Sequence, residues 1–199
     1  MTGTREQRSV GRPREFDEEA VLTAAMDAFW HQGYEATSLS DLCACTGLHK
    51  GSLYQTFGDK HQLFMMALKH YVDSMFGAFA AAANVSSSPL ENIRSVLRTA
   101  VGNACGEQGC MMINSLVELA PHDPEVKQAL QLVAGREIEM MTGLVSKAQE
   151  AGEIRSDRDP QRIARQLMVT LAGLAATVKG FVTAEEAMET IDDAIDSLV

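Results

Sequence analysis

Apolar residues recur every three or four positions along most of the chain, which is the spacing of one face of an α-helix. Phe64, Leu68, Tyr71 and Met75 show this spacing in one long segment. Runs that alternate between apolar and polar residues, which would indicate β-strands, do not occur, and neither do internal repeats. The pattern therefore predicts an all-α fold of about nine helices.

Capping residues divide the pattern into helices at definite points. Asp17 is a good helix N-cap, with Phe16 placed to pack on Val21, and Gly33 is a typical C-terminal stop. The same kinds of signal predict the other boundaries. Helix starts are expected at Ser38–Asp41, at His49, at Asp59, at Ser88–Glu91 as a capping box with Pro89, at Asp123-Pro124, at Asp159-Pro160 and at Thr183, with breaks at Thr46-Gly47 and at "CGEQGC".

Two short segments, 38–45 and 49–56, are joined by a turn that contains Gly47. Two helices joined by such a turn form a helix-turn-helix, whose second helix enters the major groove of DNA. Leu53 and Phe57 are four residues apart and would face a small core. The remaining side chains of the second helix are polar, and Gly51 would let the backbone approach DNA closely. Hydrogen bonds to bases are expected from His49, Lys50, Ser52 and Gln55, and phosphate contacts from Tyr54 and Lys60.

The stretch "GYEATSLSDLCACTGLHKGSLYQTFGDKHQLF" resembles the DNA-binding domain of the TetR family of bacterial transcriptional regulators. The resemblance covers about residues 16–64, roughly a quarter of the chain, and rests on Gly33-Tyr34, Thr37-Ser38, Gly47, the run from Lys50 to Tyr54, Phe57, Lys60 and Leu63. The sequence "GRPR" at 11–14 is similar to the basic arm that often precedes this domain. The resemblance implies DNA contacts by Arg12, Arg14, Thr37, Ser38, His49, Lys50, Gly51, Ser52, Tyr54, Gln55 and Lys60.

The resemblance also implies two domains. Residues 1–62 would form the helix-turn-helix domain with its basic arm, and residues 63–199 a helical domain for ligand binding and dimerisation. In a homodimer of this kind the last two helices, about 159–180 and 184–198, pack on their symmetry mates as a four-helix bundle. The sequence adds a sustained apolar stripe beside small residues, which we expect to form the dimer interface: Ile163, Leu167, Leu171, Leu174 and Val178.

Overall charge changes this picture little, because its distribution is uneven. The chain carries 17 Lys and Arg against 27 Asp and Glu, a formal net charge of −10, which by itself argues against binding nucleic acid. Residues 1–14, however, carry four arginines against one glutamate. No apolar run approaches the roughly 20 residues that a membrane span needs, and the N-terminus has no secretory signal. We therefore expect a cytoplasmic protein with no membrane partner.

Cys105 and Cys110 flank the short segment "GEQG" and could approach disulfide distance. Cys110 also precedes an apolar helix, and a helix N-terminus favours the reactive thiolate. Burial beside a glycine turn is the simpler interpretation of both. A regulator switched by oxidation of these thiols remains an alternative. A cytosolic helical thiol enzyme is a more distant one, since it leaves the helix-turn-helix unexplained, and we expect no enzymatic activity. Cys43 and Cys45 lack partners at zinc spacing.

A candidate ligand site is formed by Met111, Asn114 and Glu118, which share one helix face, with Met140 and Met141 as possible further members. A cavity lined by apolar residues and a few polar groups is typical of small-molecule sites. The alternative is that Asn114 and Glu118 satisfy a neighbouring helix end. No cofactor or metal is predicted. The sequence thus indicates a homodimeric repressor of a palindromic DNA operator that responds to an unidentified small-molecule effector.

Overall fold

The computed structural model describes residues 16–106 and 108–199. Over these residues the chain forms nine α-helices and no β-strand, which confirms the all-α prediction. None of these helices is long and apolar enough to cross a membrane. The helices are α1 (Glu18–Gln32), α2 (Leu39–Thr46), α3 (Lys50–Phe57), α4 (Lys60–Ala82), α5 (Pro89–Ala104), α6 (Met111–Glu118), α7 (Pro124–Glu150), α8 (Pro160–Thr177) and α9 (Ala184–Asp196).

The predicted capping residues begin seven of the nine helices. In each of these the N-cap side chain accepts a hydrogen bond from a first-turn N–H, so the polar backbone ends are satisfied locally. The N-caps are Asp17, Ser38, Asp59, Ser88, Asp123, Asp159 and Thr183. The capping box predicted at Ser88 is only half formed. The Ser88 hydroxyl accepts a hydrogen bond from Glu91 N, as in a capping box. The Ser88 N–H, however, donates to the Ser86 hydroxyl, and the Glu91 carboxylate accepts from Arg94 instead.

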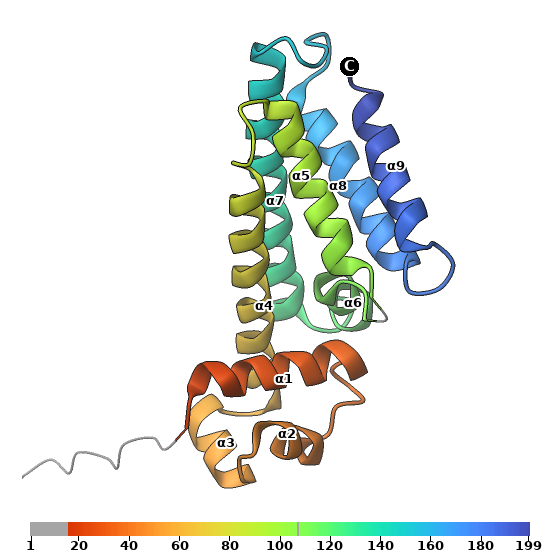
Figure 1. The fold of residues 1–199 in the computed structure, drawn as a ribbon. Coiled ribbons are helices and arrows are strands. Elements are labelled where there is room, and N and C mark those ends of the chain that lie inside the picture. The colour runs from red at the N-terminus through yellow and green to blue at the C-terminus, as the bar shows by residue number, and fades with distance from the viewer. Residues whose placement is uncertain (1–15, 107) are drawn as a thin grey trace, which may run out of the picture.

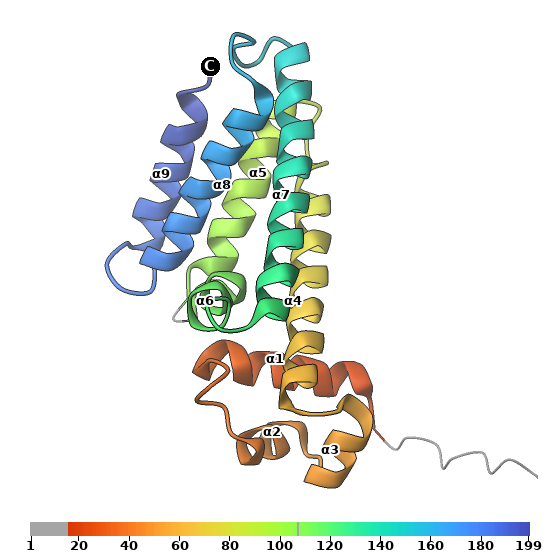
Figure 2. The ribbon, with the colours of Figure 1, turned by 180° about the vertical axis from the view of Figure 1, so that it is seen from behind.

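Figures 1 and 2 show a small helical unit, α1–α3, at one end of a bundle made by α4, α5, α7, α8 and α9. The short helix α6 lies at the end of the bundle nearest α1. Two groups of buried side chains hold this arrangement. The first, here the bundle core, includes Ile93, Leu97, Met141, Leu167 and Ile191. The second, here the N-terminal core, includes Phe29, Leu53, Phe64, Met111 and Leu130.

The N-terminal core is shared between α1–α4, α6 and the first turns of α7. Helix α4 also runs without a break through the predicted domain boundary at 62/63. The small helical unit is therefore packed against the larger part of the chain through buried apolar side chains. The division into domains 1–62 and 63–199 stays a prediction.

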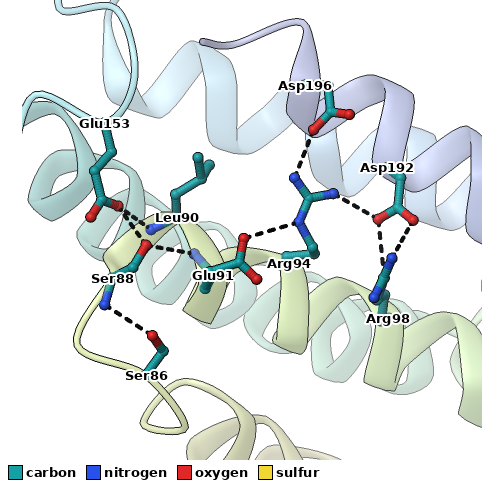
Figure 3. Close-up of polar contacts among 9 residues, drawn as sticks. All are labelled: Ser86, Ser88, Leu90, Glu91, Arg94, Arg98, Glu153, Asp192 and Asp196. Atoms are coloured by element: carbon teal, nitrogen blue, oxygen red, sulfur yellow. Dashed lines mark hydrogen bonds and ion pairs between the residues drawn. The ribbon is translucent and has the colours of Figure 1, made fainter.

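Charged side chains fasten α9 to α5 on the outside of the bundle core (Figure 3). Arg94 donates to Asp192 at 2.8 Å and to Asp196 at 2.6 Å, and Arg98 binds both oxygens of Asp192. Hydrogen bonds from Arg98 and Arg94 lower the pKa of Asp192. At the start of α5, Glu153 accepts from the Ser88 hydroxyl and from Leu90 N. Polar bonds thus tie α5 to the segment after α7 as well as to α9.

The structure places most of the predicted dimer interface inside the single chain, and its role between subunits stays a prediction. Ile163, Leu167, Leu171 and Leu174 are buried in the bundle core of the single chain, and Val178 packs against it. Side chains that α5, α7 and α9 already cover leave little surface for a contact between subunits. The apolar stripe correctly indicated burial, but the surface that buries it belongs to the same chain.

Replacement of Leu171 by Glu should therefore destabilise the single chain. An unpaired charge at a position that is 9% exposed should lower the free energy of unfolding by about 3 kcal/mol. Gln166→Glu, at an exposed position of the same helix, is the matched control and should be close to neutral. Chemical denaturation at two protein concentrations measures both. Wild-type stability of Leu171→Glu would contradict the packing described here.

Candidate nucleic-acid interface and the neighbouring cavity

Helix α3 is held by two buried side chains on its inner face. Leu53 and Phe57 are 1% and 3% exposed and lie in the N-terminal core, as the sequence predicted. The turn before α3 is made by Gly47, whose φ of +69° lies in the left-handed region that favours glycine. The buried pair fixes the rotation of the helix, so its opposite face is directed outward.

The outward face of α3 carries the polar residues that were predicted to contact DNA: His49, Lys50, Gly51, Ser52, Tyr54 and Gln55, all exposed. The Lys50 ammonium lies 5.6 Å from the Tyr54 ring centroid, which places a cation and a hydroxyl-bearing ring together. A Cβ at Gly51 would meet no atom within 4 Å, so packing inside this chain does not require glycine there.

Three further predicted contacts differ in their surroundings. Thr37 is fully buried and its hydroxyl donates to the Gly33 carbonyl at 2.6 Å, so the side chain is engaged inside the chain, and a DNA contact by Thr37 stays a prediction. Ser38 is exposed, but its hydroxyl is engaged with Asp41 in the capping box of α2. The half-buried Lys60 begins α4, with its ammonium 4.4 Å from the Tyr34 ring centroid. Arg12 and Arg14 lie outside the described residues.

The turn between α1 and α2 is fastened to the C-terminal end of α6. The two carboxylate oxygens of Glu118 accept hydrogen bonds from Tyr34 N at 3.1 Å and from Glu35 N at 2.9 Å. Gly33 has a φ of +83°, and a Cβ there would approach this carboxylate to 3.0 Å. Trp30 donates to the Gly109 carbonyl at 3.0 Å, and His61 contacts Asp123 at 2.7 Å.

Of the five predicted ligand-binding residues, Asn114 and Glu118 line one pocket of about 380 Å³ beside Trp30 and Lys179, and the three methionines do not line it. Met111 and Met141 are buried in the two cores, and Met140 packs against the bundle core. Glu118 holds the turn after α1, which matches the alternative that it satisfies a helix end. Asn114 donates to the Gln108 carbonyl and accepts from Lys179.

A cavity of about 300 Å³ lies between α6, α7 and α8. Its apolar walls include Met112 and Leu130 from the N-terminal core and Leu171 from the bundle core, so it occupies the space between the two cores. Its other lining residues are Cys110, Ile113, Leu116, Gln131, Ala134, Glu137, Ile138, Arg165, Met168, Val169, Ala172 and Ala175.

Glu137 is the acidic group of this cavity. It is half-buried, and burial raises the pKa of its carboxyl to about 7. In the described part of the chain no hydrogen bond or ion pair reaches the carboxylate. Glu137 was not among the residues predicted from the sequence, although the pattern carries a signal for it. It occupies a position of the inner stripe of α7, four residues after Val133 and four before Met141.

Cys105 and Cys110 have different neighbours. Cys105 packs against the bundle core, and burial raises the pKa of its thiol. Cys110 packs against the N-terminal core and also lines the cavity, where its sulfur accepts a hydrogen bond from the Tyr71 hydroxyl at 3.5 Å. Both thiols are free. A thiol switch through this pair stays a prediction.

The raised pKa of Glu137 predicts a pH-dependent stability. The folded protein holds this proton more tightly than the unfolded chain, so the stabilisation is complete below about pH 4.5 and is lost as the pH rises through about 7. Glu137→Gln removes this dependence. The stability of the variant relative to wild type should therefore rise between about pH 5 and about pH 8, measured by urea denaturation. If the difference in unfolding free energy between Glu137→Gln and wild type did not change with pH, the interpretation that burial desolvates the Glu137 carboxylate would be wrong.

Two family models match the chain. The model described as "Bacterial regulatory proteins, tetR family" matches residues 21–65, and the model described as "Tetracyclin repressor-like, C-terminal domain" matches residues 88–194. Among curated relatives, the uncharacterized HTH-type transcriptional regulator YezE of Bacillus subtilis is 33% identical over 192 residues, which cover 94% of this chain and 96% of YezE. The HTH-type transcriptional repressor ComR of Escherichia coli is 29% identical over 187 residues, which cover 92% of this chain and 89% of ComR.

Solved structures agree with these matches. A cysteine mutant of the TetR family transcriptional regulator CifR, in complex with 26-base-pair operator DNA, superposes with a TM-score of 0.83 at 28% identity and covers 95% of this chain and 100% of its own. A TetR transcriptional regulator from Chloroflexus aurantiacus gives a TM-score of 0.81 at 25% identity, and the match covers 89% of this chain and 91% of that regulator. The helix-turn-helix, the nine-helix architecture of the described residues and both family models lead to one conclusion: the chain belongs to the TetR family of bacterial transcriptional regulators.

Proposed function

We propose that the protein is a homodimeric, ligand-responsive repressor that binds a palindromic operator in the cytoplasm. The observation that carries this proposal is the outward polar face of α3, whose orientation is fixed by Leu53 and Phe57. Two relatives support it by name, since ComR is a repressor and the CifR mutant is held on operator DNA. Transcriptional regulators of this family are generally not enzymes, so the thiol-enzyme alternative gains no support.

Helix α6 connects the two activities that such a repressor needs. Met112 and Leu116 line the cavity, whereas Glu118 at the end of the same helix holds the turn after α1. A ligand in the cavity would favour one position of α6. The ligand would thereby shift the population of the dimer away from the spacing at which both α3 helices fit successive major grooves.

For the dimer we propose the exposed face of α8 in place of the buried stripe. Val169 is 67% exposed and Phe181, just after the helix, is 81% exposed. Between them lie Gly173 and Ala176, both exposed, and small residues allow two helices to approach closely. Helices α8 and α9 stand side by side at one edge of the bundle in both views (Figures 1 and 2). The exposure of these four residues leaves their face accessible to a second copy.

Lys50→Ala tests the face of α3 that is proposed to contact DNA. Loss of the predicted base contact should weaken binding to the operator more than binding to random DNA, and loss of the positive charge beside the phosphates should lower the slope of log K against log salt by up to about 0.9. Lys147→Ala, which changes a lysine in the last turn of α7, far from α3 in the fold, is the control and should bind as wild type does. Fluorescence anisotropy at several salt concentrations measures both. Equal slopes for all three proteins would remove Lys50 from the interface.

Val169→Glu tests the proposed dimer face. A charge placed against its own symmetry mate should shift the protein from dimer to monomer and weaken operator binding, because one half-site alone contributes too little affinity. Val85→Glu changes a similarly exposed valine in the loop between α4 and α5 and should stay dimeric. Analytical ultracentrifugation reports the outcome. If Val169→Glu remained a dimer at the wild-type dissociation constant, another face would form the interface.

A further inference from the structure

The cavity between α6, α7 and α8 combines apolar walls with a carboxylate that has no partner among the described residues. The apolar lining includes Met112, Ile113, Leu130 and Met168, and Glu137 is the acidic group among the lining residues. A desolvated carboxylate is costly unless a hydrogen-bond donor or a cation pairs with it. No hydrogen-bond donor or cation among the described residues pairs with the Glu137 carboxylate. A ligand that carries such a donor or cation would therefore gain a polar interaction inside an otherwise apolar cavity.

The charged and titratable groups around Glu137 do not remove this requirement. Arg165 also lines the cavity, but it is exposed, and burial alone accounts for the raised pKa of Glu137 with no lowering by a nearby cation. From α4, the Tyr71 hydroxyl donates to the Cys110 sulfur rather than to the carboxylate. Among the polar lining residues, Arg165 and Gln131 are thus exposed, whereas the Glu137 carboxylate is half-buried.

We infer that the effector is an amphipathic cation, an alkyl or aryl amine whose apolar part fills the space between the two cores and whose ammonium pairs with Glu137. This inference rests on the proposed function, because it names the class of ligand for the same cavity. A charge-assisted hydrogen bond in a desolvated site is among the stronger polar contacts. The apolar walls would bind the hydrocarbon with little selectivity, so Glu137 would decide which head group is preferred.

Isothermal titration calorimetry of the full-length protein with three eight-carbon probes tests the head-group preference. At about pH 8 we expect octylammonium to bind about tenfold or more tighter than 1-octanol, which corresponds to at least about 1.4 kcal/mol, and octanoate to bind most weakly. Equal affinity of octylammonium and octanol would overturn the inference. So would tightest binding by octanoate, which would assign the polar role to Arg165, or the absence of binding by all three.

Glu137→Gln identifies the group responsible. The variant should lose the preference for octylammonium and keep the affinity for octanol, whereas Glu139→Gln, an exposed carboxylate on the same helix, should behave as wild type. An unchanged octylammonium preference in Glu137→Gln would overturn the assignment. The wild-type comparison of probes stands even where this variant fails to fold, which circular dichroism would show.

Calorimetry of the free protein separates this inference from the proposed function. Operator binding is measured in its own assay without any probe. A protein that binds the operator but lacks the cation preference refutes only the ligand class. A protein that shows the preference but never binds DNA refutes the repressor and leaves the cavity chemistry intact.

Discussion

The two hydrogen bonds that Glu118 accepts from the turn after α1 join the helix-turn-helix to the rest of the molecule. Backbone N–H groups that follow a helix end need partners, and here a side chain from 84 positions further along the chain supplies one for Tyr34. The turn can take this shape because Gly33 adopts a positive φ and leaves room for the carboxylate. The same contact holds the segment before α2 against α6, and within this frame Leu53 and Phe57 set the direction of the exposed face of α3.

Helix α6 has three kinds of neighbour within its short length. Met111 and Ser115 are buried, Leu116 reaches the cavity, and Glu118 meets the turn after α1. Close packing transmits displacement, because a well-packed interior deforms little. A short helix in this position cannot change its place at the cavity without a change at the turn. The proposed coupling between ligand binding and DNA binding therefore needs no long chain of intermediate residues.

Much of the local structure could be predicted from the sequence, since helix caps and the pair Leu53 and Phe57 depend on neighbours a few residues away. Contacts between segments that lie far apart in the sequence could not be predicted in this way. The stripe from Ile163 to Val178 shows that one face of a helix is buried, but not which surface buries it. Thr37 occupies the expected place in the motif, yet the direction of its hydroxyl is decided by the Gly33 carbonyl. The cavity required three separate segments to be placed together, although Glu137 interrupts an apolar stripe and was detectable.

The position of Trp30 gives the molecule an optical property. It is the only tryptophan of the chain, and its indole N–H bonds to Gly109 while its ring meets Tyr71 edge-on at 5.1 Å. One partner precedes α6 and the other belongs to α4, so all tryptophan fluorescence arises at the joint between the two parts. Any rearrangement there alters the indole hydrogen bond or its aromatic neighbour, and the protein reports its own conformational state without an attached dye.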